Sequence, residues 1–348
     1  MKTRKLLSLL LAAALALALL AGCGGNNSGN AGGGAGQAAN DASDTNEPAG
    51  NDAGGAEEEE TALDPDENYE TGDASLDDPR NQDGIGEKEL LVVSFGTSYN
   101  DSRRLTIGAI EAAMAEAFPD WSVRRAFTSQ IIIDHVASRD GVAIDNVTQA
   151  LDRAVDNGVK TLVVQPTHLM NGLEYEELMN TLAEYSDAFE SISVGEPLLT
   201  SDEDFQAVME AIVAATADYD DGQTAICFMG HGTEHDANGV YAKLQQLLTD
   251  SGHANYYIGT VEAEPTLEDL LASVGQGDYS RVVLLPLMVV AGDHANNDMA
   301  GDEDGSWRLA FEDAGYQVEC VLTGLGEMEA IQDLFAAHAQ AAVDALEG

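Results

Sequence analysis

The sequence predicts an α/β protein with two similar lobes, each a parallel sheet flanked by helices. Two observations point to this fold class. Apolar runs rich in β-branched residues alternate with stretches of helical periodicity from about residue 90 to the C-terminus, a pattern typical of parallel strands joined by helical crossovers. The same short motifs also recur in the same order in both halves of this region, which indicates an internal duplication.

Each half contains its own set of predicted strands with helices between them. In the first half we expect strands at 90–95, 122–127, 161–165 and 191–194, and helices near 102–117, 145–157 and 173–189. In the second half we expect strands at 224–229, 255–260, 281–290 and 317–322, and helices near 202–216, 239–251, 266–274, 307–314 and 328–347.

The duplication is supported by matching positions in the two halves. One strand in each half leads into a proline-to-glycine segment of the same length, and Glu174 and His294 stand two residues beyond the respective glycine. Thr97, just after the first strand, corresponds in the same way to His231. Two lobes related by a pseudo-twofold axis would therefore present four side chains at the lips of one cleft: Thr97, Glu174, His231 and His294.

The first residues have the pattern of a bacterial lipoprotein signal. Basic residues precede an apolar run at 6–21, which is shorter than the roughly 20 residues that a transmembrane helix needs. The following Gly22-Cys23 resembles the end of a lipobox, in which the cysteine is diacylated. We therefore expect residues 1–22 to be a signal peptide and Cys23 to anchor an exported, extracytoplasmic protein to the cell membrane. The alternative is an ordinary secretory signal that happens to end in cysteine.

Residues 23–88 are predicted to form a disordered acidic tether. Gly, Ala, Asn, Asp and Glu dominate this segment, so it supplies too few apolar side chains for a core. The rest of the chain is long enough for two lobes, which we place at 89–196 and 197–348. The predicted C-terminal helix either stays with its own lobe or packs on the N-terminal one.

The chain is strongly acidic, with 62 Asp and Glu against 15 Lys and Arg and a formal net charge of −47. This argues against nucleic acid as a partner, because binding it depends on neutralising phosphates. Besides Cys23 the chain has only Cys227 and Cys320, without a CxxC pattern. We expect two buried thiols, and a disulfide between them stays open.

Two histidines stand just beyond strand-like apolar runs, His231 after 224–229 and His294 after 281–290. In open α/β sheets, ligands bind at the carboxyl ends of the strands. Imidazoles from different strands can converge there on one divalent metal ion, with Glu262 as a hard oxygen ligand. The sequence therefore predicts a metal-handling site made of these three side chains.

A set of motifs resembles the anaerobic sirohydrochlorin cobaltochelatases, which belong with the ferrochelatases to the class II chelatases. The resemblance runs from about residue 89 to the C-terminus. Where the family pattern has Tyr-His-Asp, this chain has Asn100 in the middle position, and it carries an export signal whereas most such enzymes are cytoplasmic. The motifs are LVVSFGTS (91–98), RAFTS (125–129), NG with EYE (171–176), FMGHG (228–232), LMVVAGDHA with NDM (287–299) and GLGE (324–327).

The resemblance implies a chelatase that inserts Co²⁺ into sirohydrochlorin in anaerobic cobalamin biosynthesis, with Fe²⁺ or Ni²⁺ as open alternatives and no organic cofactor. It implies an open cleft between two lobes, metal held by His231, His294 and Glu262, and Glu174 as a further cleft glutamate. We expect the two histidines to deliver the metal and to share in proton abstraction. A homo-oligomer stays open.

Other side chains are expected to bind the tetrapyrrole. Thr97 and His168 are predicted to line the cleft, and Arg125 is a candidate for the substrate carboxylates, which arginine can bind in a bidentate manner. Arg103 and Arg104 are further candidates, with surface ion pairing as the alternative. The competing interpretation of the whole chain is an extracytoplasmic haem-, tetrapyrrole- or metal-binding protein that feeds an importer without turnover.

Overall fold

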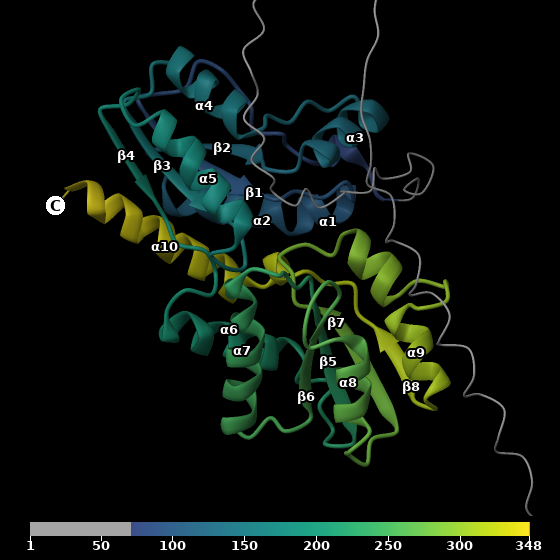
Figure 1. Ribbon diagram of the computed structural model, residues 1–348. Coiled ribbons are helices and arrows are strands. Elements are labelled where there is room, and N and C mark those ends of the chain that lie inside the picture. Colours follow the sequence, from purple (N-terminus) through teal and green to yellow (C-terminus); the bar gives the residue numbers. More distant parts are fainter. Residues whose placement is uncertain (1–70, 348) are drawn as a thin grey trace, which may run out of the picture. The chain divides into compact units, whose positions relative to one another are not determined.

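Two sheets of four parallel strands form the centres of two lobes (Figure 1). The computed structural model describes residues 71–347. The N-terminal sheet has the order β2-β1-β3-β4 and the C-terminal sheet the order β6-β5-β7-β8, so both lobes share one topology and the predicted fold class is confirmed. The strands are β1 (Lys88–Ser94), β2 (Ser122–Phe127), β3 (Thr161–Pro166), β4 (Ser191–Val194), β5 (Thr224–Gly230), β6 (Tyr256–Thr260), β7 (Arg281–Pro286) and β8 (Gln317–Cys320).

Several helices begin where a polar side chain caps them. Asn146, Ser201 and Thr266 each accept a hydrogen bond from the backbone N–H three residues on, which satisfies a donor that a helix start leaves free. The α-helices are α1 (Asn100–Leu105), α2 (Ile107–Ala117), α3 (Gln130–Asp140), α4 (Val147–Asp156), α5 (Leu173–Glu184), α6 (Asp202–Ala215), α7 (Gly239–Asp250), α8 (Leu267–Val274), α9 (Trp307–Asp313) and α10 (Glu329–Glu347). Shorter elements are η1 (Ala74–Leu76), η2 (Asp236–Asn238), the π-helix η3 (Ala295–Met299) and η4 (Leu325–Glu327).

Strand side chains alternate between two buried faces, as expected for sheets covered on both sides. In β1, Leu90 and Val92 pack with α2 and α10, whereas Leu91 and Val93 pack with α4 and α5. In the C-terminal sheet, α6 and α7 cover one face, and α8 and α9 cover the other. The central strands of both sheets are therefore buried, and their carboxyl ends are places where polar side chains can reach solvent.

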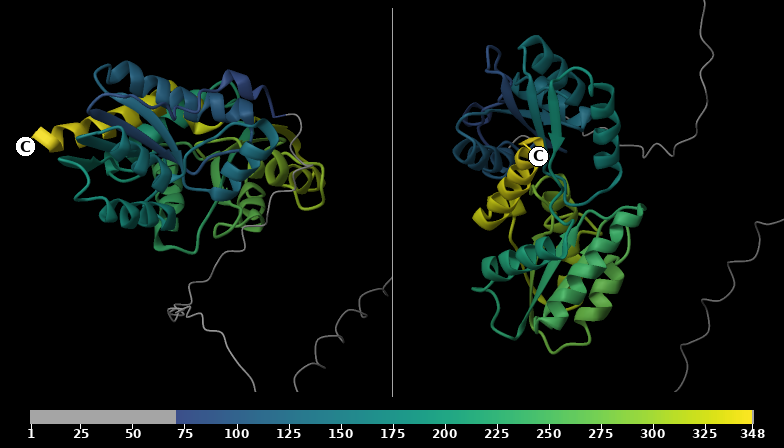
Figure 2. Two further views of the ribbon diagram at one scale, coloured as in Figure 1. Left: turned by 90° about the horizontal axis from the view of Figure 1, so that it is seen from above. Right: turned by 90° about the vertical axis from the view of Figure 1, so that its left-hand side faces the viewer.

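One hydrophobic cluster continues from the N-terminal sheet to the C-terminal sheet. Helix α10 contacts α2, β3 and β4 of the N-terminal lobe and also contacts α6. Its side chains Ile331 and Phe335 are fully buried. The last helix of the chain thus packs on the first lobe, along which it runs in yellow in Figures 1 and 2.

Two local differences from the predicted elements have clear causes. Helix α3 was not predicted; Ser129 caps its start and Gly141 ends it with a φ of 69°. The predicted strand 281–290 ends at Pro286. The apolar residues that follow leave the sheet: the Leu287 N–H still donates to Met229 O, but Met288 O and Val289 O accept hydrogen bonds from residues of η4.

The predicted signal peptide, Cys23 and most of the predicted tether lie outside the described residues. Among residues 71–347, no helix combines the length and the apolar character of a membrane span. Cys227 is buried and Cys320 is partly exposed, and both are free thiols, so the disulfide that the sequence left open is not formed.

The boundary of the predicted tether at residue 88 needs correction. Residues 71–87, here called the strap, lie on the N-terminal lobe: the Thr71 carbonyl accepts from Asp101 N–H at 2.7 Å, and the Glu87 carbonyl accepts from Lys160 N–H at 2.8 Å. Asp77, with its side chain 2 % exposed, forms ion pairs with Arg103 and Arg125, each with an N–O distance of 2.7 Å. Composition missed this because buried ion pairs and backbone hydrogen bonds hold the strap, and Ile85 is its apolar side chain that packs against the core.

The strap generates a prediction about truncation. A protein that starts at residue 71 should unfold with the free energy of the full chain. One that starts at residue 89 should lose about 3–5 kcal/mol, because a buried charge without its partner is strongly destabilising and Asp77 serves two arginines. Urea unfolding of the two truncated proteins measures this. Asp77→Asn should also be destabilised, whereas Asp78→Asn, at an exposed neighbouring position, should stay near the parent; equal stability of the two truncated proteins would show that the strap is dispensable.

A second prediction concerns Glu89, the buried second residue of β1. Its carboxylate lies 4.0 Å from Arg124 Nη1 without a hydrogen bond, and burial raises its pKa to about 7. Between the ordinary pKa and 7 the folded protein holds a proton that the unfolded chain has lost, so the free energy of unfolding should fall as pH rises through this window. Glu89→Gln should abolish that part of the slope and stabilise the protein at pH 8 by an amount on the order of 1–3 kcal/mol.

Urea unfolding of parent and Glu89→Gln at several values between pH 5 and pH 8 tests this. All other titrating groups are common to both proteins, so the difference between the two curves isolates Glu89. A difference that is constant with pH would show that Glu89 is ionised throughout.

Candidate metal centre

Three neighbouring strands deliver three potential metal ligands to one edge of the C-terminal sheet. His231 directly follows β5, Glu262 follows β6 by two residues, and His294 follows β7. In the parallel ladder Gly230 pairs with Thr260 and Met229 pairs with Pro286, so the carboxyl ends of β5, β6 and β7 coincide. This is the edge at which open α/β sheets bind ligands.

The ligating atoms of His231, Glu262 and His294 all lie within 4.8 Å of one another. The two imidazole rings are 4.8 Å apart between centroids and meet edge to face at 77°. Glu262 is exposed. Two nitrogens and one carboxylate oxygen form a donor set suited to Co²⁺, Fe²⁺ or Ni²⁺, and three ligands leave coordination positions open. The structure thus brings together all three ligands predicted from the sequence.

His231 is held by its own backbone surroundings. Its Nδ1 lies 2.8 Å from Gly232 O, and because a carbonyl only accepts, Nδ1 carries the proton and Nε2 keeps its lone pair for a metal. The His231 carbonyl accepts from Glu262 N–H at 2.8 Å, which ties the two ligand positions together. Both flanking residues must be glycine: a Cβ at Gly230 would lie 2.3 Å from the Tyr241 ring, and Gly232 has a φ of 89°.

His294 is oriented by a carboxylate. Its Nδ1 lies 2.7 Å from Asp298 Oδ2, so Nδ1 donates the hydrogen bond and Nε2 is free to bind metal. This is the carboxylate–histidine arrangement that fixes the tautomer and strengthens metal ligands. The hydrogen bond to Asp298 raises the pKa of His294 above its ordinary value; burial opposes the shift, and the charges of Asp298, Asp293 and Glu262 add to it.

Sequence reasoning assigned no role to Asp298, although the resemblance included it in a motif. Asp298 is the fourth residue after His294, and a helical turn brings residues at that spacing together. The signal was therefore present as His-x-x-x-Asp. It was hidden because the segment was not predicted to be helical, and the structure shows a π-helix there, an element that is frequent at functional sites.

Glu174 and His168 lie outside the three-ligand group, at the corresponding end of β3. Glu174 is exposed in the first turn of α5. Neither ring nitrogen of His168 has a hydrogen-bond partner, and burial lowers its pKa to about 4, although the charge of Glu174 opposes the shift. His168 is therefore a neutral imidazole at physiological pH. Burial raises the pKa of Tyr241 to about 12, and the charge of Glu174 adds to the shift, while the hydrogen bond that the Tyr241 hydroxyl accepts from Gly232 N–H opposes it.

Arg125 does not bind substrate carboxylates in this fold, which corrects the sequence-based prediction. Its side chain is fully buried and pairs with Asp77 and Glu111. Arg103 is also fully buried and pairs with Asp77, whereas Arg104 pairs with Asp101 at the surface. Sequence alone could not separate an internal ion pair from an exposed cation, because the main partner lies in a segment predicted to be disordered.

Thr97 is buried with 3 % of its surface exposed, and it follows β1 as predicted. Its Oγ1 accepts from Tyr99 N–H at 3.2 Å. A Cβ on Gly292 would lie 3.0 Å from this oxygen, so Thr97 contacts the segment that leads to His294. The structure therefore places Thr97 against the loop that carries His294, with little surface left for a substrate.

Comparisons with known proteins agree with this geometry. The chain is 38% identical over 258 residues to a sirohydrochlorin cobaltochelatase of Salmonella typhimurium, covering 74% of this chain and 97% of that protein. It is 33% identical over 263 residues to the sirohydrochlorin cobaltochelatase CbiKC of Nitratidesulfovibrio vulgaris, covering 75% and 92%.

Solved structures support the fold. SirB from Bacillus subtilis with Fe³⁺ superposes with a TM-score of 0.52 at 12% identity, covering 75% of this chain and 97% of that one. The sirohydrochlorin chelatase SirB of Bacillus subtilis subspecies spizizenii in complex with cobalt has a TM-score of 0.52 at 13% identity, covering 76% and 98%. At the level of sequence, residues 88–344 match the family described as cobalt chelatase (CbiK). The chain belongs to the cobalt chelatase (CbiK) family.

Proposed function

We propose that this protein is a sirohydrochlorin cobaltochelatase, an enzyme that inserts Co²⁺ into sirohydrochlorin in anaerobic cobalamin biosynthesis. The observation that carries the proposal is the convergence of His231, Glu262 and His294 at the ends of three adjacent strands. Family membership and the relatives named as sirohydrochlorin cobaltochelatases support the choice of metal and tetrapyrrole.

Metal insertion requires that the ion exchange water for macrocycle nitrogens and that two pyrrole protons leave. A site with few protein ligands suits the first requirement, because the ion keeps positions at which the tetrapyrrole can enter. His231 and His294 present Nε2 lone pairs, since hydrogen bonds hold both Nδ1 protons away from the site. The two histidines can therefore hold Co²⁺ as a substrate without enclosing it.

The same side chains can accept the pyrrole protons. Once Co²⁺ passes into the macrocycle, the imidazoles lose their metal and become bases again, and Asp298 stabilises a proton on His294 by raising its pKa. Glu262 is exposed and lies next to both rings, so it can act as the third ligand or pass protons to solvent. Glu174 is a further exposed carboxylate that we assign to the opposite lip of the cleft.

The export signal in the sequence supports a further part of the proposal: the enzyme works outside the cytoplasm, anchored to the cell membrane through a lipid on Cys23. The acidic segment between Cys23 and the strap then acts as a flexible spacer between the membrane and the folded lobes. Its composition favours an extended chain, because like charges repel and few apolar residues are available for a core.

We expect His231→Ala and His294→Ala each to abolish Co²⁺ insertion into sirohydrochlorin, because an ion held by about three ligands loses much of its affinity when one imidazole is removed. The absorbance change on insertion reports the rate, and calorimetry with Co²⁺ alone reports the site. His253→Ala is the matched control: this histidine packs on Tyr256 before β6 begins, at the opposite end of the strand from the ligands. Parent-like Co²⁺ binding by both site variants would disprove the convergent site.

Glu262→Gln separates charge from shape at the same site. The amide keeps the volume but removes the negative charge, so insertion should slow by more than the affinity for the tetrapyrrole changes. If the parent protein binds both Co²⁺ and sirohydrochlorin but never inserts the metal, the chain is not an enzyme. The alternative interpretation, a binding protein that feeds an importer, then holds.

Cys23→Ala tests the anchor. The variant should appear as an unprocessed precursor or be released from the membrane, because the thiol that would carry the lipid is absent. Fractionation of cells that express parent and variant measures this, and mass spectrometry of the mature N-terminus identifies the lipid. A processed variant that stays in the membrane fraction would contradict lipidation at Cys23.

A further inference from the structure

The loop that carries His294 rests on helix α1 of the other lobe. The Ser102 hydroxyl accepts a hydrogen bond from Ala291 N–H at 3.0 Å, between residues 189 positions apart in the sequence. One residue later, a Cβ on Gly292 would lie 3.0 Å from Thr97 Oγ1, so the backbone there packs directly on the Thr97 side chain. These contacts lie two and three residues before His294.

This loop needs an external support. Strand β7 ends at Pro286, so residues 287–294 leave the sheet before they reach the site. The carbonyls of Ala291 and Gly292 accept from the Asn296 side chain, which closes the turn on itself. The Ala291 N–H is instead held from outside, by Ser102. This donor lies three residues before His294, so the hydrogen bond links the N-terminal lobe to the loop close to that side chain.

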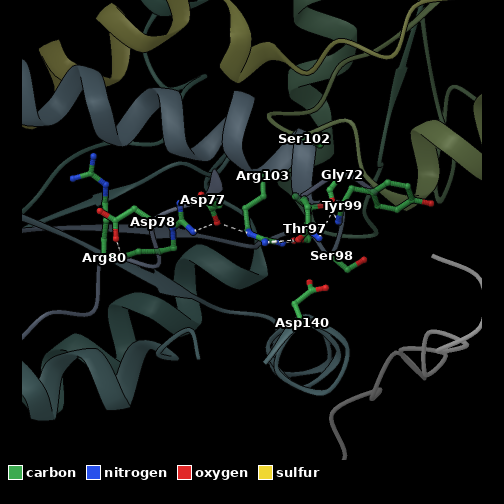
Figure 3. A network of polar contacts seen from close by, with 12 residues as sticks. Gly72, Asp77, Asp78, Arg80, Thr97, Ser98, Tyr99, Ser102, Arg103 and Asp140 are labelled. Carbon is green, nitrogen blue, oxygen red and sulfur yellow. Dashed lines mark hydrogen bonds and ion pairs between the residues drawn. The ribbon is translucent and has the colours of Figure 1, made fainter. Parts of the chain in front are cut away.

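Helix α1 is itself held in place by the strap. Arg103, the neighbour of Ser102, is fully buried. Its Nε donates to Asp77 Oδ2 at 2.7 Å, and its Nη1 donates to Thr97 O at 3.2 Å. Figure 3 shows Asp77, Arg103 and Thr97 joined in this order by hydrogen bonds. The strap, helix α1 and the turn after β1 therefore form one connected unit beneath the His294 loop.

We propose that Ser102 is a positioning residue for the metal site, which sets the place of His294 through the backbone of Ala291, and that Asp77 acts on the same loop through Arg103. This inference rests on the proposed function of His294 as a ligand. It follows from geometry: a metal ligand must be held within about half an ångström of its productive position, and a loop outside the sheet reaches that precision only where a rigid element fixes it.

Ser102→Ala tests the proposal with Co²⁺ as the probe. Loss of the acceptor should weaken Co²⁺ binding roughly threefold to thirtyfold and shift the visible absorption of bound Co²⁺, because remote positioning contacts couple to a site in that range and ligand geometry sets the spectrum. Ser102→Thr keeps a hydroxyl at the same place and should restore both. Calorimetry and absorption spectroscopy on the full chain give the two measurements.

The matched control is Ser201→Ala. It makes the same chemical change at the cap of α6 and should cost stability, as loss of a helix cap does, without altering Co²⁺ affinity or spectrum. Asp77→Asn should weaken Co²⁺ binding in the same direction as Ser102→Ala. The double variant should lose less than the product of the two single effects, since both act on one loop.

The possible outcomes distinguish failure of the proposed metal site from failure of the proposed positioning role of Ser102. If the parent does not bind Co²⁺, the metal site and the positioning role both fail. If the parent binds and Ser102→Ala keeps its affinity and spectrum, or Ser102→Thr fails as badly as Ser102→Ala, the metal site stands and the positioning role is wrong. Equal loss of Co²⁺ affinity in Ser201→Ala would show that general destabilisation causes the effect.

Discussion

The parallel ladder of β6, β5 and β7 is the constraint on which the site depends. Parallel strands in adjacent positions end at the same edge, so residues that are 31 and 63 positions from His231 in the sequence reach it in space. Helices on both faces bury the three strands β5, β6 and β7, and their carboxyl ends remain open to solvent. Backbone pairing therefore brings the three strand ends together, and the loop after β7 carries His294 the remaining distance to His231 and Glu262. Hydrogen bonds to Gly232 O and to Asp298 then fix the tautomers of the two candidate histidine ligands.

The distribution of charged side chains also matters for the substrates. Within residues 71–347 every arginine pairs with a carboxylate, and Arg103, Arg124 and Arg125 do so in the interior. The surface is left with a large excess of Asp and Glu. The negative electrostatic potential of these carboxylates raises the local concentration of divalent cations. The acidic surface thus favours metal capture, whereas the arginine side chains stabilise the fold.

Periodicity predicted the strands and helices of the two lobes well, because the central strands β1, β3, β5 and β7 are buried along nearly their whole length and are mostly apolar. The predicted strand continued past Pro286 because Leu287 and Val290 are also apolar. Leu287 is buried in the cluster that runs between the two sheets, and Val290 packs against the cluster around α3 of the N-terminal lobe. Periodicity also missed α3, whose polar and apolar residues lack a clear stripe, and the strap, whose order comes from Asp77. In each case a tertiary contact decided what a local pattern left ambiguous.

The sequence by itself determined the fold class, the family and the three side chains that converge at the candidate metal centre, because alternation and strand-end position are encoded locally and the motifs are specific. Only the tertiary structure decided what surrounds those ligands. Asp298 reaches His294 through a π-helical turn, Arg125 turns inward to Asp77, and Ser102 supports Ala291 from the other lobe. The Arg125 and Ser102 contacts join residues whose separation in sequence carries no periodic signal, so packing alone selects them. The four-residue spacing of His294 and Asp298 becomes informative only once the segment between them is known to be helical.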